Sequence, residues 1–337
     1  MIKLDPIESI LYRKVPEGSS FEPSEVWLTE GFVSPEKGPD AEEEMVDEEL
    51  RLKADAQSLA PRYPKENQVI AIDTTSLTLG HILDGVVGAI RASVVVKPAN
   101  ESRWKLERYG PYLVSITEQE KEALYQELYA TVHGVEASPR ALDPIGTLEQ
   151  TRNLFERYIQ QEVVRGYRDS LILLDGSLVA AAIVKPSSFV KRVVDQAKEN
   201  NNAIAAISKT TKLTLERSRR NILSLLEAVR GPCYVGGVKG HIKRNRDRYL
   251  GDIYVVRFTP LGEPFRVDLL ETPHWPHVEI LNLVSGLAGD HGYPEELRLA
   301  HMTCVLSAIE VLELQSAAMA LHKLVIKEEL RPRLFPL

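Results

Sequence analysis

Two apolar runs that each lead into an aspartate constrain this chain more than any other feature of its sequence. The segment Leu171–Leu178 reads LILLDGSL, so four apolar residues run directly into Asp175 and a Gly-Ser turn. An apolar run of this length bounded by a turn predicts a buried strand. The run Val69–Ile72 has the same shape and leads into Asp73, 102 residues before Asp175. Two strand-end aspartates predict two halves of one carboxylate site, although aspartate is also a common first residue of turns.

The composition is that of an ordinary globular protein, and it argues against membrane spans, a disulfide framework and a cysteine-based zinc site. Of the 337 residues, 44% are hydrophobic and 26% are charged, which suits one large domain or two smaller ones. No apolar run approaches the roughly 20 residues that span a bilayer, and the N-terminus lacks the layout of a signal peptide. We therefore expect a cytoplasmic protein with no membrane partner. Cys233 and Cys304 are the only cysteines, too few for a disulfide framework or a cysteine-based zinc site. The net charge of −7 argues against a broadly basic nucleic-acid coat but allows a local basic groove.

The pattern of the chain changes near residue 67. Residues 1–66 are punctuated by proline and glycine and carry the acidic run DAEEEMVDEE over 40–49. They predict an N-terminal extension whose acidic charges are solvated or contact a basic partner. A short helix is expected within 47–59. Residues 67–330 alternate between strand and helix patterns and predict a single domain.

Periodicity predicts a mixed fold across this domain. Strands are expected at 69–73, 88–97, 112–116, 171–175 and 203–207, with a hairpin formed by 252–258 and 264–270. Helices are expected at 118–131, 146–165, 188–200, 213–230 and 278–289, followed by a long helix from 294 towards 327. This order predicts an α/β fold, a ribonuclease H-like mixed sheet flanked by helices, with an N-terminal extension and a helical C-terminal part. In that architecture carboxylates from separate elements converge on Mg²⁺ or Mn²⁺, which prefer oxygen ligands.

Seven segments of the chain resemble, in order and with comparable spacing, the motifs of the NurA nuclease family. They read IAIDTTSLTLG, GAIRASVV, RNLFERYI, LILLDGSL, AISKTTKL, YVVRF with PFRVDLL, and GYPEELRLAH, and they span about residues 67–310. The resemblance implies a ribonuclease H-like fold and metal-dependent cleavage of DNA, usually stimulated by Mn²⁺, with 5′–3′ exonuclease and single-strand endonuclease activity. It also implies a homodimer that works with a HerA-type hexameric ATPase in DNA end processing, in repair or in defence. The first motif reads DTTS where many members have glycine after the aspartate, which changes the turn but keeps the acid.

The resemblance also implies which carboxylates bind metal. Asp73 and Asp175 fall on the family's two aspartates and are expected to bind Mn²⁺ or Mg²⁺ directly. Glu156 falls on the helical glutamate and is the expected third ligand. Glu149 and Glu162 of the same helix are the alternatives to it.

Basic and aromatic residues complete the expected site. His301 falls where the last motif places a polar residue near the metals, so it could bind a metal or handle the leaving-group proton, or could be an ordinary core histidine. Lys209 matches the family's lysine and could hold the scissile phosphate or steady the developing charge, or could be an ordinary lysine that leads into a helix. Tyr293 could stack on a base of a single strand or simply pack at the start of a helix. Further DNA contacts are expected from Arg152, which could instead pair with a nearby acid. They are also expected from Lys243, Arg244 and Arg246 of the basic stretch KGHIKRNRDR, which could instead be a solvated loop.

Two other classes of function stay open. A strand-end aspartate followed by threonine also occurs in actin-like and sugar-kinase ATPases, which need glycine-rich nucleotide loops later in the chain. Gly236, Gly237 and Gly240 are a poor candidate for such a loop, and no P-loop sequence occurs. A catalytically silent adaptor that regulates a DNA translocase would keep the fold without the chemistry. Manganese-dependent DNA cleavage supports the nuclease, ATP hydrolysis supports the second class, and the adaptor shows neither activity.

Overall fold

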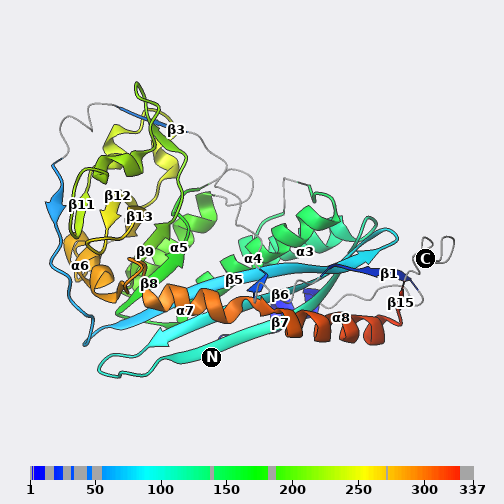
Figure 1. Cartoon of the computed structure of the whole chain (residues 1–337). Helices are drawn as coiled ribbons and strands as arrows, with labels where there is room; N and C mark the ends of the chain where they lie inside the picture. The colour runs from blue at the N-terminus through cyan, green and yellow to red at the C-terminus, as the bar shows by residue number, and fades with distance from the viewer. Residues whose placement is uncertain are drawn as a thin grey trace, which may run out of the picture.

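The computed structural model is built on a large mixed sheet with helices on both faces (Figure 1). It describes residues 2, 4–11, 19–25, 32–33, 44–47, 55–136, 140–180, 187–270 and 272–326. Of the acidic run over 40–49, only residues 44–47 fall within this description. Where residues 47–59 are described they contain no helix, and Gln57–Ser58 form the short strand β4. No helix in these ranges is both long enough and apolar enough to cross a membrane.

Five central strands give the sheet its topology. β6 pairs antiparallel with both β5 and β7, whereas β8 pairs parallel with β5 and with β9. The spatial order is therefore third, second, first, fourth and fifth strand, with the second antiparallel to the other four. This arrangement is the ribonuclease H-like fold, which confirms the predicted fold class. The five strands are β5 (Gln68–Ile82), β6 (Gly85–Lys97), β7 (Lys105–Thr117), β8 (Ser170–Asp175) and β9 (Ala203–Ser208).

Further strands extend the sheet at both sides. Beyond β9 the predicted hairpin is present, formed by the antiparallel strands β13 and β12, and β11 and β4 follow it. On the other side β1 pairs with the far end of β5 and with β15, so the segment 1–66 contributes strands to the main sheet. The bounds are β1 (Ser20–Pro23), β11 (Cys233–Val235), β12 (Asp252–Arg257), β13 (Phe265–Leu270) and β15 (Val325–Ile326).

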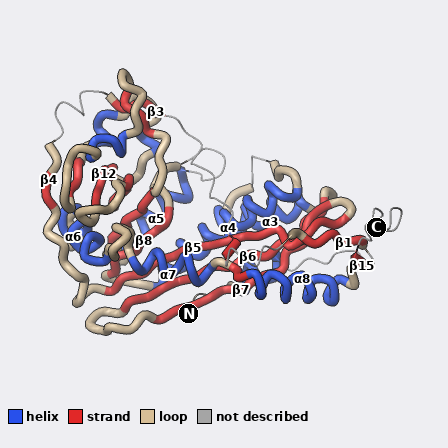
Figure 2. Tube along the Cα trace, viewed as in Figure 1, coloured by secondary structure: helices blue, strands red, loops and turns tan. Residues whose placement is uncertain are grey.

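The central strands are buried on both faces, which explains their continuous apolar runs. Even-numbered residues such as Ile70 and Ile172 belong to one apolar cluster with α1, α3, α4 and α5. Odd-numbered residues such as Val69 and Leu171 belong to a second cluster with α6 and α7. Figure 2 shows α3 and α4 along one side of the long strands and α8 along the other. The helices are α1 (Asp5–Leu11), α3 (Lys121–His133), α4 (Pro144–Gly166), α5 (Ser187–Glu199), α6 (His277–Leu287), α7 (Glu295–Cys304) and α8 (Ala308–His322).

β5 continues nine residues past Asp73, so the predicted strand end at this residue is wrong. Residues 74–82 are rich in β-branched and apolar side chains and pair along β6. The parallel neighbour β8 does end here, since its last residue paired with β5 is Leu174, opposite Ile72. Asp73 therefore lies where β5 stops pairing with β8. The edge of the parallel strands predicted at this residue is present.

The helix predicted over 213–230 is also wrong, because this segment belongs to a small lobe between β9 and β12. Leu213 and Leu215 bury their side chains, and their strand β10 (Leu213–Leu215) pairs in parallel with β3 (Glu44–Val46). Pairing with a strand about 170 residues earlier in the chain overrides the local helical pattern. We call residues 209–250 the basic lobe, because they hold eleven Lys and Arg residues against three Asp and Glu, a net charge of +8. Its 3₁₀ helices are η1 (Ile222–Leu226), η2 (Val238–His241) and η3 (Arg246–Arg248).

The long helix predicted from 294 towards 327 is two helices, α7 and α8, separated by the strand β14 (Leu306–Ser307). β14 pairs with β2 (Phe32–Val33). The Ser307 hydroxyl accepts the backbone N–H of Glu310, and the Glu310 carboxylate accepts the backbone N–H of Ser307. Ser-x-x-Glu is the capping box of a helix N-terminus. The break was therefore readable from the sequence.

Glu310 also ties this helix start to the sheet, and this gives a pH-dependent contribution to stability. Its carboxylate lies 2.6 Å from a guanidinium nitrogen of Arg91, which is almost fully buried. Partial burial alone would raise the pKa of Glu310, but hydrogen bonds from Arg91 and Ser307 lower this pKa to about 2. Because the folded-state pKa lies below the ordinary value of 4.5, the stabilisation is complete above that value and is lost as the pH falls towards 2.

We expect Glu310→Gln to lower the free energy of unfolding at neutral pH by about 1 kcal/mol, because glutamine can still cap the helix but loses the charge that pairs with Arg91. The difference from the wild type should shrink as the pH falls from 4.5 towards 2. Urea unfolding at neutral pH and at two acidic values in that window measures both effects. A difference that stays constant across the series would contradict this account.

Candidate active site

Asp73 and Asp175 lie on neighbouring parallel strands, at the same end of the pairing between β5 and β8. Ile72 and Leu174 are paired residues of β5 and β8, and each is followed directly by one of the aspartates. Neighbouring strands lie about 4.8 Å apart, and residues in register direct their side chains to the same face. Burial, followed by the charges of Asp175 and Asp73, raises the pKa of Tyr293, which agrees with this arrangement. The structure thus brings together the two acids that the sequence paired.

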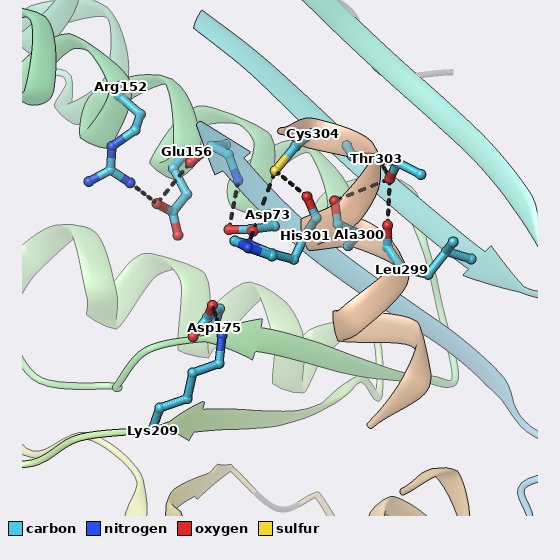
Figure 3. Close-up of polar contacts among 12 residues, drawn as sticks. Asp73, Arg152, Glu156, Asp175, Lys209, Leu299, Ala300, His301, Thr303 and Cys304 are labelled. Carbon is cyan, nitrogen blue, oxygen red and sulfur yellow. Dashed lines mark hydrogen bonds and ion pairs between the residues drawn. The ribbon is translucent and has the colours of Figure 1, made fainter. Parts of the chain in front are cut away.

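The carboxylate of Asp73 is buried and held by groups from two elements. It is 1% exposed, and its Oδ1 accepts the backbone N–H of Thr74 at 2.9 Å. Its Oδ2 lies 2.7 Å from Nδ1 of His301 and 3.4 Å from Sγ of Cys304, both on α7 (Figure 3). One ligand atom from each of these three side chains lies within 4.8 Å of the other two. This spacing can hold a metal ion.

Cys304 is the member of this cluster that the sequence analysis did not select. It is fully buried and follows His301 by three residues on α7. Side chains three residues apart on a helix share one face, so the sequence carried a signal for it once α7 was recognised as a helix. Sulfur suits softer metals than Mg²⁺, whereas the aspartate oxygen and the histidine nitrogen both suit Mn²⁺.

Glu156 meets β5 from the face opposite to α7. Its Oε2 accepts the hydroxyl of Thr74, the residue after Asp73, at 3.1 Å. Its Oε1 accepts an N–H of Gln160 at 3.1 Å, and a guanidinium nitrogen of Arg152 lies 3.4 Å from Oε2. Figure 3 shows Glu156, Asp73 and Asp175 coming from three separate elements, with Arg152 beside Glu156. Arg152 thus pairs with the acid one helical turn away, which was the stated alternative to a DNA contact.

The two alternatives to Glu156 have other surroundings. Glu149 is exposed at the start of α4. Glu162 lies 2.6 Å from Arg165 on the same helix. Of the three glutamates, only Glu156 has a described contact with the strand that carries Asp73.

Lys209 and Tyr293 border Asp175. The ammonium of Lys209 lies 3.3 Å from Oδ2 of Asp175 and 4.8 Å from the centre of the Tyr293 ring, and its side chain is half exposed. Tyr293 is 9% exposed and packs against Phe265, with ring centres 5.5 Å apart. This burial agrees with the packing alternative for Tyr293 and leaves no open ring face for stacking on a base.

The hydroxyl of Tyr293 is nonetheless a candidate functional group. Burial, followed by the charges of Asp175 and Asp73, raises the pKa of Tyr293 well above its usual value, so the hydroxyl stays protonated. The oxygen is buried and has no hydrogen-bond partner among the residues that the structure describes. A buried polar group without a partner costs free energy, and a bound ion, water or ligand commonly satisfies it.

The residues of the basic stretch lie in the basic lobe, away from the described contacts of the carboxylates. The ammonium of Lys243 lies 2.6 Å from Glu216 and 3.8 Å from Asp47. Arg246 donates to backbone oxygens of the lobe, and Arg244 is exposed. These three residues are thus part of a positively charged surface rather than of the carboxylate cluster.

The donor set at the sheet edge fits a divalent cation. It combines a carboxylate oxygen of Asp73 with a nitrogen of His301 and the sulfur of Cys304, and Asp175 follows the paired residue of the neighbouring strand. Oxygen with nitrogen is the set that Mn²⁺ accepts and, with fewer nitrogens, Mg²⁺. The sequence predicts a metal site at this edge, and this group is the candidate for it.

No protein-family model and no curated protein matches the sequence. Among solved structures, the chain is similar to the NurA nuclease from Sulfolobus solfataricus, with 14% identity, a TM-score of 0.48, and coverage of 81% of this chain and 89% of that one. It is similar to a NurA bound to dAMP and manganese, with 10% identity, a TM-score of 0.47, and coverage of 75% and 87%. It is also similar to endonuclease V from Streptomyces avermitilis, with 12% identity, a TM-score of 0.37, and coverage of 80% and 91%. The fold assignment itself rests on the strand order and pairing of this chain.

Proposed function

We propose that this protein is a divalent-metal-dependent DNA nuclease, which hydrolyses phosphodiester bonds. One observation carries the proposal: Asp73 and Asp175 directly follow the last paired residues of the parallel strands β5 and β8, and Glu156 contacts the residue after Asp73. Carboxylates that converge from separate strands and a helix are what a ribonuclease H-like sheet supplies to divalent cations. The sequence motifs that resemble the NurA family place acids at the same three positions.

Asp73, Asp175 and Glu156 would hold Mn²⁺ or Mg²⁺, with His301 as a fourth ligand. When bound, such ions activate water and neutralise the charge that develops on the phosphate. Lys209, half exposed beside Asp175, would hold a phosphate oxygen of the strand to be cut.

Two side chains beside the carboxylates could supply protons. His301 is 39% exposed and its Nδ1 lies on Asp73, so its other ring nitrogen would either bind the metal or, in place of that role, donate a proton to the leaving oxygen. The protonated Tyr293 hydroxyl would donate a hydrogen bond to phosphate or to bound water.

The basic lobe would guide the DNA backbone to this site. It begins at Lys209, and its net charge of +8 contrasts with the −7 of the whole chain. Phosphate contacts of this kind give affinity without sequence preference and weaken with salt. We further propose, from the sequence resemblance, that a homodimer acts with a HerA-type hexameric ATPase in DNA end processing, in repair or in defence.

Metal removal gives the direct test of this function. The wild type should cut end-labelled single- and double-stranded DNA in Mn²⁺, lose this activity with EDTA, and recover it when Mn²⁺ is restored. The assay is run with and without a HerA-type ATPase, and ATP hydrolysis by the isolated chain is measured beside it. ATP hydrolysis without DNA cleavage would move the assignment to the actin-like and sugar-kinase class, and the absence of both activities would move it to the adaptor.

A further inference from the structure

The strand β13 contributes to the site described above only the ring of Phe265, which packs on Tyr293, yet two of its charged side chains are almost completely buried. Arg266 is 4% exposed and Asp268 is 1% exposed. Nε and Nη2 of Arg266 each donate to one carboxylate oxygen of Asp268 at 2.8 Å, which forms a two-pronged ion pair. Removing two charges from water is costly, and apolar residues of similar volume often serve stability as well. Stability alone therefore does not explain why this pair stands inside the sheet.

Asp268 also holds the turn that follows Asp175. Its Oδ2 accepts the backbone N–H of Leu178, three residues after Asp175, at 2.9 Å. Gly176 within this turn has φ +121°, a conformation that other residues rarely adopt. The turn is further fixed to β9, because Gly176 donates its N–H to Ile207 and accepts the hydroxyl of Ser208. The buried carboxylate thus anchors the turn that directly follows Asp175.

Arg266 extends the same connection towards Lys209. Its Nη1 lies 3.5 Å from the hydroxyl of Thr211, two residues after Lys209, and its guanidinium lies over the ring of Tyr249 at 5.4 Å. The ion pair thus contacts both the turn after Asp175 and the segment after Lys209. The side chains of Asp175 and Lys209 themselves lie 3.3 Å apart.

We propose that Asp268 is a positioning residue, which with Arg266 fixes Asp175 and Lys209 relative to each other and so sets the affinity of the site for its divalent metal. The inference rests on the proposed function. Asp268 acts through the turn after Asp175 and touches neither the metal nor DNA.

Asp268→Asn tests this role, because it keeps the size of the side chain and removes the charge that holds Arg266. The matched control is Asn202→Asp, which changes a buried side chain at the opposite end of β8. Oδ1 of Asn202 accepts the backbone N–H of Ser170, the first residue of β8, at 3.1 Å. Both variants alter one side chain that anchors an end of the same strand, and only Asp268 anchors the end that carries Asp175.

Mn²⁺ binding is measured by titration calorimetry on the full chain without DNA, together with thermal unfolding and cleavage rates over a range of Mn²⁺ concentrations. We expect Asp268→Asn to weaken Mn²⁺ binding at least tenfold and to recover most of its cleavage rate at high Mn²⁺. Asn202→Asp should bind Mn²⁺ within twofold of the wild type even where it lowers the unfolding temperature. If Asp268→Asn does not fold, Arg266→Lys replaces it, since lysine keeps the charge but not the two-pronged geometry, and the same loss of Mn²⁺ affinity is expected.

Wild-type Mn²⁺ affinity in the folded Asp268 or Arg266 variant, or an equal loss in Asn202→Asp, would overturn the inference. A wild type that binds Mn²⁺ but cuts no DNA would refute the proposed function instead, and the inference is then judged on Mn²⁺ affinity alone.

Discussion

Replacing Asp73 or Asp175 with asparagine is expected to reduce Mn²⁺-dependent DNA cleavage at least ~1000-fold, a loss of about 4 kcal/mol of transition-state stabilisation. Asparagine has nearly the size of aspartate but lacks the charge that binds a hard cation, so the metal site is lost while the packing is kept. For Asp73 the amide oxygen can still accept the backbone N–H of Thr74, so the fold of β5 should persist. Initial rates on end-labelled single-stranded DNA, together with thermal unfolding of each variant, measure the two parts of this expectation.

Asp195→Asn is the matched control for this pair. Asp195 is an exposed residue of α5, and the same change of charge there should leave the cleavage rate within twofold of the wild type. A folded Asp73 or Asp175 variant that cuts at the wild-type rate would remove the carboxylate pair from the mechanism.

The sheet edge was predictable because its information is local. Leu171–Leu174 is apolar throughout since both faces of β8 are covered, and the Gly-Ser pair after Asp175 marks the end of the strand. Asp73 was found for the same reason, even though β5 does not end there. The sequence of one strand does not show where its pairing with a neighbouring strand stops. Asp73 lies at an edge because β8 ends beside it, although β5 continues.

The errors come from contacts between distant segments. The stretch 213–230 has a helical pattern, and only its pairing with β3 makes a strand of its first residues. The count of two cysteines excludes a disulfide framework but does not single out Cys304, which contacts Asp73 because it lies one helical turn after His301 on α7. The contacts of Arg266 and Asp268 could not be predicted either, because Thr211 and Leu178 are distant from them in the sequence and meet them only in the folded sheet.

Glu156→Gln is expected to lower the cleavage rate at least ~100-fold, about 2.7 kcal/mol, with the fold intact. Glutamine can still accept the Thr74 hydroxyl that Glu156 accepts at 3.1 Å, so the contact between α4 and β5 is kept while the ligand charge is lost. The smaller effect than at the aspartates follows from the position of Glu156, which reaches the edge from the opposite face of β5 and already shares its charge with Arg152. Rates at saturating and limiting Mn²⁺ separate a weakened metal site from a slowed reaction.

Glu149→Gln and Glu162→Gln complete this series as controls. Helix geometry places both glutamates away from the site, each for a different reason. Glu149 lies seven residues before Glu156, hence on the same face of α4 but about 10 Å away along its axis, and it is exposed. Glu162 lies six residues after it, on another face, and pairs with Arg165. Both variants should cut within twofold of the wild type, and Glu162→Gln should cost only the small stability of a surface ion pair. Loss of activity in Glu149→Gln but not in Glu156→Gln would contradict this assignment. In that case α4 would have to shift by two turns along β5 to bring Glu149 to the metal. The contact between Thr74 and Glu156 would then be absent from the active protein.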